Sequence, residues 1–266
     1  MDDLSRAYPI WLCDVWGVVH DGHKPIAPAV AALTRHRSKG GKVIFITNAP
    51  RPKAPVRAQL DRIGVSRSAY DGMVTSGDVT RQLMVEYGGG GLFHIGPQED
   101  LSLFEGLALK RVPVEQASAV ICTGFFDDEQ ETAKDYLPIL QKIKARDLTL
   151  ICANPDKVVW QKDRLYPCAG AIAEEYEVLG GKVLMAGKPF APIYDEALAL
   201  VGKPDKAQVL AIGDGPETDI KGALDNGLAC VFVSGGINLD ADAEAVVRAK
   251  YHTAKILRAM PELYWA

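Results

Sequence analysis

Residues 10–22 read Ile-Trp-Leu-Cys-Asp-Val-Trp-Gly-Val-Val-His-Asp-Gly, which is an apolar run interrupted by an acid, Asp14. A short, continuously apolar run is typical of a strand that is covered on both faces of a sheet. An acid embedded among apolar residues needs a cation or several backbone N–H groups as partners. The stretch therefore predicts a buried strand with a polar site at its carboxyl end.

Similar apolar runs recur along the chain and alternate with helical patterns. The runs cover residues 10–15, 42–47, 72–76, 92–95, 119–123, 148–153, 182–186, 209–213 and 229–234. Helical patterns cover residues 29–39, 55–63, 131–145 and 191–201, and we expect a packed terminal helix over 252–265. This alternation predicts an open, doubly wound α/β fold with a parallel sheet. In such folds ligands bind beyond the carboxyl ends of the strands.

The composition excludes several classes of protein. The chain has 266 residues, of which 48% are apolar and 24% charged, so it is not a disordered chain, a collagen-like fibre or a coiled coil. A net charge of −4 gives no reason to expect nucleic acid or an anionic membrane surface as partner, and no apolar run reaches the length of a membrane span.

The cysteines indicate the compartment. Five cysteines lie scattered along the chain without zinc-ligand spacing, and four of them fall in or beside apolar runs, so we expect buried thiols. The acidic start at Met1-Asp2-Asp3 lacks the features of a signal peptide. These observations favour a cytoplasmic location.

An ordered set of polar residues follows the predicted strands: Asp14, Thr47-Asn48, Lys188, Asp214 and Asp219. Each one has an ordinary explanation as a helix cap, a surface lysine or a turn residue. Together they meet the needs of phosphoryl transfer. Two carboxylates can hold Mg²⁺, one carboxylate can attack phosphorus, and Thr, Asn and Lys can neutralise the phosphoryl oxygens.

This order resembles the haloacid dehalogenase-like (HAD) hydrolase superfamily. The four motifs are Asp14-Val15-x-Gly17, Thr47-Asn48, Lys188, and Gly213-Asp214 with Thr218-Asp219, and the spacing looks like class IIA. That class contains p-nitrophenyl phosphatases, nucleotide phosphatases, phosphoglycolate phosphatase and pyridoxal phosphatase. The resemblance implies a Rossmann-like core, an inserted cap domain and a phosphohydrolase that forms an aspartyl-phosphate.

The resemblance also assigns roles to residues. It implies that Asp14 is the nucleophile and that Thr47, Asn48 and Lys188 bind the phosphate. It implies that Mg²⁺ is held by Asp14, the Trp16 backbone carbonyl and Asp214, with Asp219 orienting the metal shell. The substrate is then a small phosphate ester of the sugar-phosphate or nucleotide class, and the family's caps favour a homodimer.

The spacing predicts where the cap is inserted. From Thr47 to Lys188 is 188 − 47 = 141 residues, whereas a whole βαβ unit takes about 30 residues. We therefore expect a discontinuous core over residues 1–76 and 182–266, and an α/β cap over 77–181. Asn154 and Asp156 are candidate substrate contacts in this cap. An equally good interpretation of Asn154-Pro155-Asp156 is a tight turn held by side-chain hydrogen bonds.

The sequence departs from the family's phosphatases at Trp16, where an acid/base Asp is usual. Three interpretations follow: a phosphohydrolase in which another group replaces the acid, a low-activity protein that binds phosphorylated metabolites, and a metal-independent dehalogenase. An aromatic residue at this position favours the third, whereas the acids Asp214 and Asp219 favour a metal. His20 and Asp21 are nearby candidates for the acid, although a polar turn explains them better.

Overall fold

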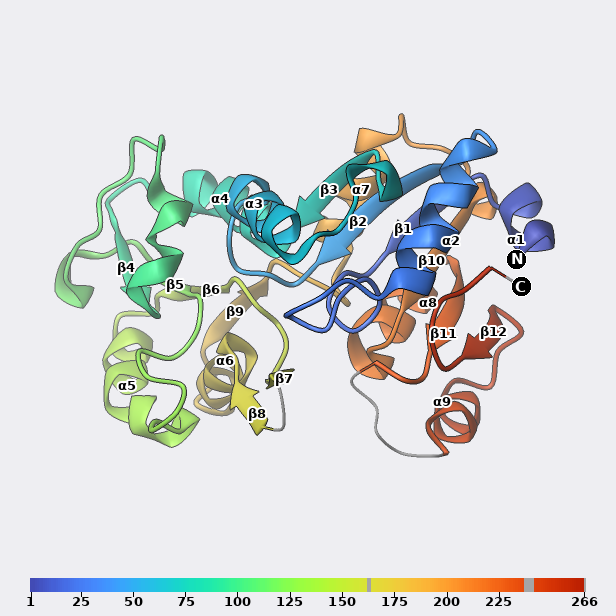
Figure 1. The fold of residues 1–266 in the computed structure, drawn as a ribbon. Coiled ribbons are helices and arrows are strands. Elements are labelled where there is room, and N and C mark those ends of the chain that lie inside the picture. The colour runs from blue at the N-terminus through green and yellow to red at the C-terminus, as the bar shows by residue number, and fades with distance from the viewer. Residues whose placement is uncertain (162–163, 237–241, 266) are drawn as a thin grey trace. The chain divides into compact units, whose positions relative to one another are not determined.

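A computed structural model describes residues 1–161, 164–236 and 242–265 of the chain (Figure 1). The chain divides into two compact units. The first comprises Met1–Thr47, Ala54–Val74 and Lys188–Ala266, and the second comprises Asn48–Lys53 and Thr75–Gly187. Each unit is built around its own parallel sheet, as the alternation of elements predicts.

The first unit contains a six-stranded parallel sheet in the order β12-β11-β10-β1-β2-β3. Its strands are β1 (Ile10–Cys13), β2 (Lys42–Thr47), β3 (Gly72–Thr75), β10 (Val209–Gly213), β11 (Ala229–Val233) and β12 (Ile256–Met260). Its helices are α1 (Asp2–Ala7), α2 (Ala27–Ser38), α3 (Lys53–Ile63), α7 (Ala191–Leu200), α8 (Lys221–Asp225) and α9 (Ala243–Tyr251).

The strand order of this sheet reverses between β1 and β10. From β1 the chain adds β2 and β3 on one side, and from β10 it adds β11 and β12 on the other. Because crossovers between parallel strands are right-handed, the two series place their connections on opposite faces and leave a crevice at the reversal. The central strands are fully buried, which matches their continuous apolar sequence.

The second unit contains a four-stranded parallel sheet in the order β4-β5-β6-β9. These strands are β4 (Leu92–Ile95), β5 (Ala119–Cys122), β6 (Thr149–Cys152) and β9 (Lys182–Met185). Its helices are α4 (Ser76–Tyr87), α5 (Leu137–Ala145) and α6 (Ala169–Val178), and β7 (Val158–Gln161) pairs antiparallel with β8 (Arg164–Pro167). Helix α4 begins at a capping box in which Thr75 and Asp78 each bind the other's backbone N–H.

Both faces of the four-stranded sheet carry an apolar core. One cluster contains Leu140, Ile143 and Ile172 from α5 and α6, and the other contains Met84 from α4. Alternate residues of β5 feed the two clusters, as the period of a strand requires: Val120 joins the first and Ile121 the second. The second unit is therefore an α/β unit with a core of its own.

Two sequence expectations are wrong in their details. The expected return to the core at residue 182 falls inside the second unit, because β9 pairs with β6 and the first unit resumes only at Lys188. The expected helix over residues 252–265 is replaced by β12, which pairs with β11 and buries Ile256 and Met260. An apolar residue at every fourth position suits a helix, but the unpaired edge of β11 binds this segment as a strand.

The prediction of buried thiols is confirmed by the structure. All five cysteines are free and buried. Within the described ranges no helix combines the length and the apolar character needed to cross a membrane.

Candidate active site

The reversal of strand order in the first unit brings Asp14 and Asp214 together. Asp14 directly follows β1, and Asp214 directly follows β10, which pairs with β1 in register. The Asp14 backbone N–H donates to the Ile212 carbonyl at 2.8 Å and so extends the ladder to the acid. Sheet pairing therefore places both carboxylates at one edge, in the crevice where ligands bind in this fold class.

A third acid, Asp219, joins them from the helical turn Pro216–Ile220. Its Oδ2 accepts a hydrogen bond from the Gly215 backbone N–H at 3.0 Å, which turns the side chain back toward the end of β10. Asp14, Asp214 and Asp219 are all buried, and each offers a carboxylate oxygen such that the three oxygens lie within 4.8 Å of one another. Three of the acids predicted from the sequence thus form one cluster.

Lys188 supplies the positive charge of this cluster. Its Nζ donates to Asp14 Oδ1 at 2.5 Å and to Asp219 Oδ1 at 2.7 Å, and the side chain is only 3% exposed. Burial alone would lower the pKa of Lys188, but the charges of Asp14 and Asp219 outweigh burial and raise this pKa well above its usual range. The lysine is therefore an ammonium ion held between two carboxylates.

The acids still outnumber the cation. Burial and the neighbouring charge of Asp14 raise the pKa of Asp219 to about 6, although Lys188 acts in the opposite direction. Three carboxylates and one ammonium ion give a formal charge of 1 − 3 = −2 when all are ionised. A further cation would offset this repulsion, and a set of clustered carboxylate oxygens is what Mg²⁺ or Ca²⁺ prefers. The residues present therefore fit a divalent metal.

The backbone of three glycines packs closely against this cluster of acids. A Cβ atom on Gly17 would lie 2.0 Å from Asp214 Oδ2, and one on Gly236 would lie 1.9 Å from the same oxygen. A Cβ atom on Gly213 would lie 2.2 Å from Asp219 Cγ. Gly17 also adopts a φ of +81°, which side chains rarely adopt. These positions have to be glycine because the carboxylates occupy the space that a side chain would need.

Trp16 stands where a second acid is usual in the family, and its ring is held by the loop that follows. The Trp16 and His20 rings meet edge to face at 5.2 Å, and a Cβ atom on Gly22 would lie 2.7 Å from Trp16 Cη2. The Gly22 N–H donates to His20 Nδ1 at 2.9 Å, and Asp21 Oδ1 accepts the N–H groups of His23 and Lys24. Asp21 thus stabilises a turn, as the polar-turn interpretation expects.

The remaining predicted residues divide between the units. Thr47 is the last residue of β2, beside β1 in the first unit, and it is buried. Asn48, Asn154 and Asp156 belong to the second unit. There Asn48 Nδ2 donates to Asp156 Oδ1 at 3.1 Å, and the Asp156 N–H donates to Asn154 Oδ1 at 3.1 Å. The second of these bonds is the one expected of a tight Asn-Pro-Asp turn.

Sequence reasoning missed Tyr194, a buried residue of α7 in the first unit. Burial, and then the charge of Asp219, raises the pKa of its hydroxyl well above the usual range, so the hydroxyl stays protonated beside the acids. A Cβ atom on Gly222 would lie 2.3 Å from this hydroxyl. The only signal in the sequence is its position in the helix that follows Lys188 and Pro189.

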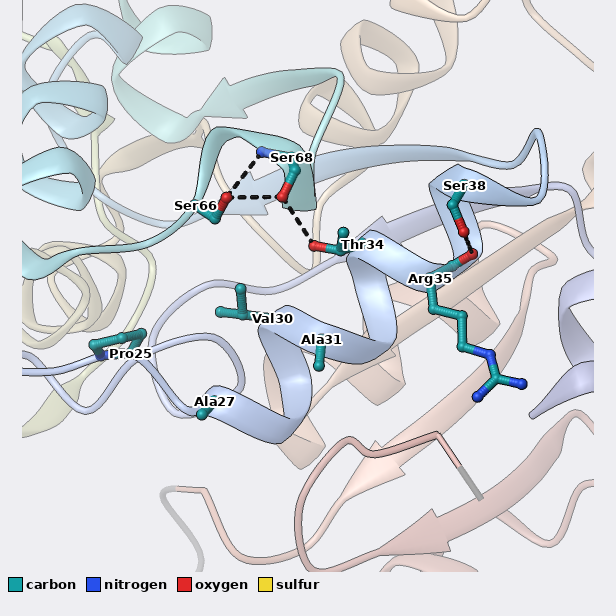
Figure 2. A pocket seen from close by; sticks show the side chains of 9 residues that line it. All are labelled: Pro25, Ala27, Val30, Ala31, Thr34, Arg35, Ser38, Ser66 and Ser68. Carbon is teal, nitrogen blue, oxygen red and sulfur yellow. Dashed lines mark hydrogen bonds between the residues drawn. The ribbon is translucent and has the colours of Figure 1, made fainter.

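A second concave region of the first unit lies along α2 and has a different character. Figure 2 shows its lining, which is made of Pro25, Ala27, Val30, Ala31, Thr34, Arg35, Ser38, Ser66 and Ser68. Arg35 is the one charged residue in this lining, and Ser68 bonds both Ser66 and Thr34. This lining holds no carboxylate, so it gives no reason to expect a metal site.

Known proteins share the sequence pattern and the fold of this chain. Residues 11–110 match the family model of haloacid dehalogenase-like hydrolases, and residues 185–260 match a second HAD-hydrolase-like model. A solved hydrolase of the haloacid dehalogenase-like family from Brucella suis is 47% identical, with a TM-score of 0.88 over 99% of this chain and 98% of that chain. The chain belongs to the haloacid dehalogenase-like hydrolase superfamily.

Other proteins similar to this chain are phosphatases by name. D-glycerol 3-phosphate phosphatase of Mycobacterium tuberculosis is 27% identical over all of this chain and 77% of its own length. A solved glycerol phosphate phosphatase of the same organism, in complex with calcium, is 25% identical with a TM-score of 0.69, over 88% of this chain and 68% of that chain. Two solved proteins named as nitrophenyl phosphatases, from Thermotoga maritima and Archaeoglobus fulgidus, share the fold at 22% and 20% identity, with TM-scores of 0.77 and 0.78.

Proposed function

We propose that this HAD hydrolase is a Mg²⁺-dependent phosphohydrolase that acts on a small phosphorylated metabolite, of the sugar-phosphate or nucleotide class, through an aspartyl-phosphate on Asp14. The observation that carries the proposal is the buried cluster of Asp14, Asp214 and Asp219 at the reversal of the sheet, in which Lys188 bonds Asp14 and Asp219. The phosphatase names of the relatives support the same reaction class.

In this proposal Asp14 is the nucleophile. Its carboxylate attacks phosphorus, the bond from phosphorus to the ester oxygen breaks, and an acyl phosphate forms on Asp14. Lys188 holds the attacking carboxylate in place and carries its positive charge beside the transferring group. Thr47 and Asn48 supply further hydrogen-bond donors to the phosphoryl oxygens. Water then breaks the acyl phosphate and releases inorganic phosphate.

The metal would be held by the Asp14 and Asp214 carboxylates and the Trp16 backbone carbonyl. When bound, it would supply positive charge that offsets the repulsion between the carboxylate and the phosphate ester. Asp219 acts on this site through Lys188 and through the Gly215 backbone, because its two oxygens bond these groups. We therefore assign Asp219 to orienting the metal shell.

The second unit is proposed to be the cap, which selects the substrate in this superfamily. Asn154 and Asp156 are the candidate substrate contacts, and the hydrogen bond from Asn48 Nδ2 to Asp156 Oδ1 links them to a proposed phosphate-binding residue. A homodimer and a cytoplasmic location remain predictions from the sequence.

The test is a screen of phosphorylated metabolites with and without Mg²⁺, with Asp14→Asn as the blank. We expect phosphate release from sugar phosphates or nucleotides that needs both Mg²⁺ and Asp14. Trp16 keeps two other functions open. Tight binding of a phosphate ester without turnover would establish a metabolite-binding protein, and halide release without metal would establish a dehalogenase.

A further inference from the structure

The residue two positions after Asp14 decides how the second half of the reaction can run. In the first half, a phosphate ester with an acidic alcohol or phenol loses that group as an anion, so no proton donor is needed. In the second half, water attacks the acyl phosphate and must give up a proton, while Asp14 leaves as a carboxylate. A missing general base therefore slows the second half more than the first, typically by about 10²- to 10⁴-fold.

Trp16 cannot supply this base, and its ring contacts the loop that follows. The indole is held between the His20 ring, at 5.2 Å, and the backbone of Gly22. Its only polar atom is an N–H group, which donates a hydrogen bond but accepts no proton. The position is thus filled by an apolar ring.

The polar groups beside Trp16 are already engaged. His20 is buried, and its Nδ1 accepts the Gly22 N–H, which leaves the ring hydrogen on Nε2 in the neutral form. Asp21 Oδ1 accepts two backbone N–H groups. Asp219 accepts from Lys188 on one oxygen and from Gly215 on the other. These hydrogen bonds give His20, Asp21 and Asp219 structural roles in the first unit.

We propose that Asp14 is a long-lived phosphorylation site, on which the phosphoryl group accumulates because esters with good leaving groups phosphorylate Asp14 faster than water removes the group. The inference rests on the proposed function, since it requires Asp14 to be the nucleophile. In each cycle one bond from phosphorus to the ester oxygen breaks and one bond from phosphorus to Asp14 Oδ forms. Water later breaks this second bond and yields inorganic phosphate and a proton.

The test is rapid-quench kinetics on the whole chain with p-nitrophenyl phosphate and Mg²⁺. We expect a burst of p-nitrophenol that approaches one equivalent per enzyme, followed by turnover at least about 10²-fold slower. Acid-quenched protein should gain the mass of one phosphoryl group. Peptide mapping should place this group on Asp14, and hydroxylamine should remove it, as expected of an acyl phosphate.

Two substitutions of Trp16 by side chains of equal size separate the effect of adding a carboxyl group from the effect of removing the indole ring. Trp16→Asp introduces a carboxyl group that can take the proton from water, so the phosphorylated fraction should fall and steady turnover should rise by about 10²-fold. Trp16→Asn has nearly the same shape without the carboxyl group, so the phosphorylated fraction should stay above that of Trp16→Asp. Equal fractions in the two variants would contradict the proposal.

The results for the wild-type chain distinguish a failure of this inference from a failure of the proposed phosphohydrolase function. Steady release of p-nitrophenol that needs Asp14, without a burst or phosphoprotein, overturns the inference and leaves the phosphohydrolase intact. Equal release by wild type and Asp14→Asn overturns both.

Discussion

The two parallel sheets of this chain differ in how their strands follow one another. In the first unit the order reverses between β1 and β10, whereas in the second unit β4, β5, β6 and β9 follow in one direction. A reversal sends neighbouring connections to opposite faces and leaves room between them, and a single direction does not. The acid cluster lies at the reversal, so topology separates two sheets that look alike in sequence.

The polar groups at the two carboxyl edges also differ in their balance of charge. The first unit gathers three carboxylates, of which two pair with the one lysine, Lys188. In the second unit His94 Nε2 bonds Thr123 Oγ1 at 3.0 Å, and Thr123 in turn bonds the buried acid Asp100. Here each group has a partner of its own. A site that needs a further cation is the better candidate for chemistry than one whose polar groups satisfy each other.

Substitution of an acid should affect phosphate release most at the carboxyl edge of the first unit's sheet, and Asp14→Asn should have the largest effect. Removing the proposed nucleophile is expected to lower kcat for phosphate release by at least about 10³-fold. The matched control is Asp100→Asn, which changes an equally buried acid of the second unit and should keep most of the rate. Phosphate release under saturating substrate is the measurement, and full activity in Asp14→Asn would refute the nucleophile.

Lys188→Met should destabilise the first unit strongly. The substitution leaves Asp14 and Asp219 buried without their shared cation, and breaking a buried pair in this way costs about 3–5 kcal/mol. Lys157→Met is the control in the second unit, because its pair with Glu174 is exposed and should contribute less than about 1 kcal/mol. Urea denaturation of the two variants measures the difference, and equal losses would contradict the assigned role of burial.

Mg²⁺ should stabilise the wild-type chain against heat. A ligand present at 100 times its Kd adds about 2.7 kcal/mol to the free energy of unfolding. Asp214→Asn removes a proposed metal ligand and should abolish most of the rise in melting temperature, whereas Asp100→Asn should keep it. A rise that is the same in all three proteins would place the metal elsewhere.

The smallest effect is expected for Asp100 of the second unit, whose titration should make the stability of the chain depend on pH. Burial raises the pKa of Asp100 to about 6, although its bond to Thr123 and the charge of Arg51 oppose the shift. The folded chain therefore holds this proton more tightly than the unfolded chain does, and stability is lost as pH rises from about 4 to about 6.

Asp100→Asn removes this loss. The variant should be more stable than wild type above pH 6, and the difference should shrink toward pH 4, because each pKa unit corresponds to about 1.4 kcal/mol. Urea denaturation at pH 4.5, 6 and 8 measures the trend. A wild-type chain that is the more stable one at pH 8 would contradict it.

Apolar runs allowed the strands to be predicted, but not the sheet that each one joins. The run that begins at Lys182 has the composition of any buried strand, and only its hydrogen bonds to β6 show that it belongs to the second unit. The segment from Ile256 to Met260 carries apolar residues at a spacing that suits a helix or a strand, and tertiary pairing with β11 decides it.

The acids of the site could be predicted because each one directly follows a strand or lies in the helical turn after it, and strand ends meet at one edge. Their partners could not be predicted so readily. Asn48 and Asp156 are 108 residues apart in the sequence, and nothing in the sequence around either residue indicates that they form a hydrogen bond. Tyr194 resembles any other aromatic residue of an apolar helix until its surroundings are known.

The glycines around the acid cluster have a consequence for how such proteins lose their activity in evolution. Gly17, Gly213 and Gly236 leave room for Asp214 and Asp219, so a single added methyl group at any of them would displace a carboxylate while every acid stayed in place. A descendant could then keep Asp14, Lys188, Asp214 and Asp219 and still be inactive. Surveys that recognise active homologues by their acids alone would count such a protein as an enzyme, whereas surveys that also require these glycines would not.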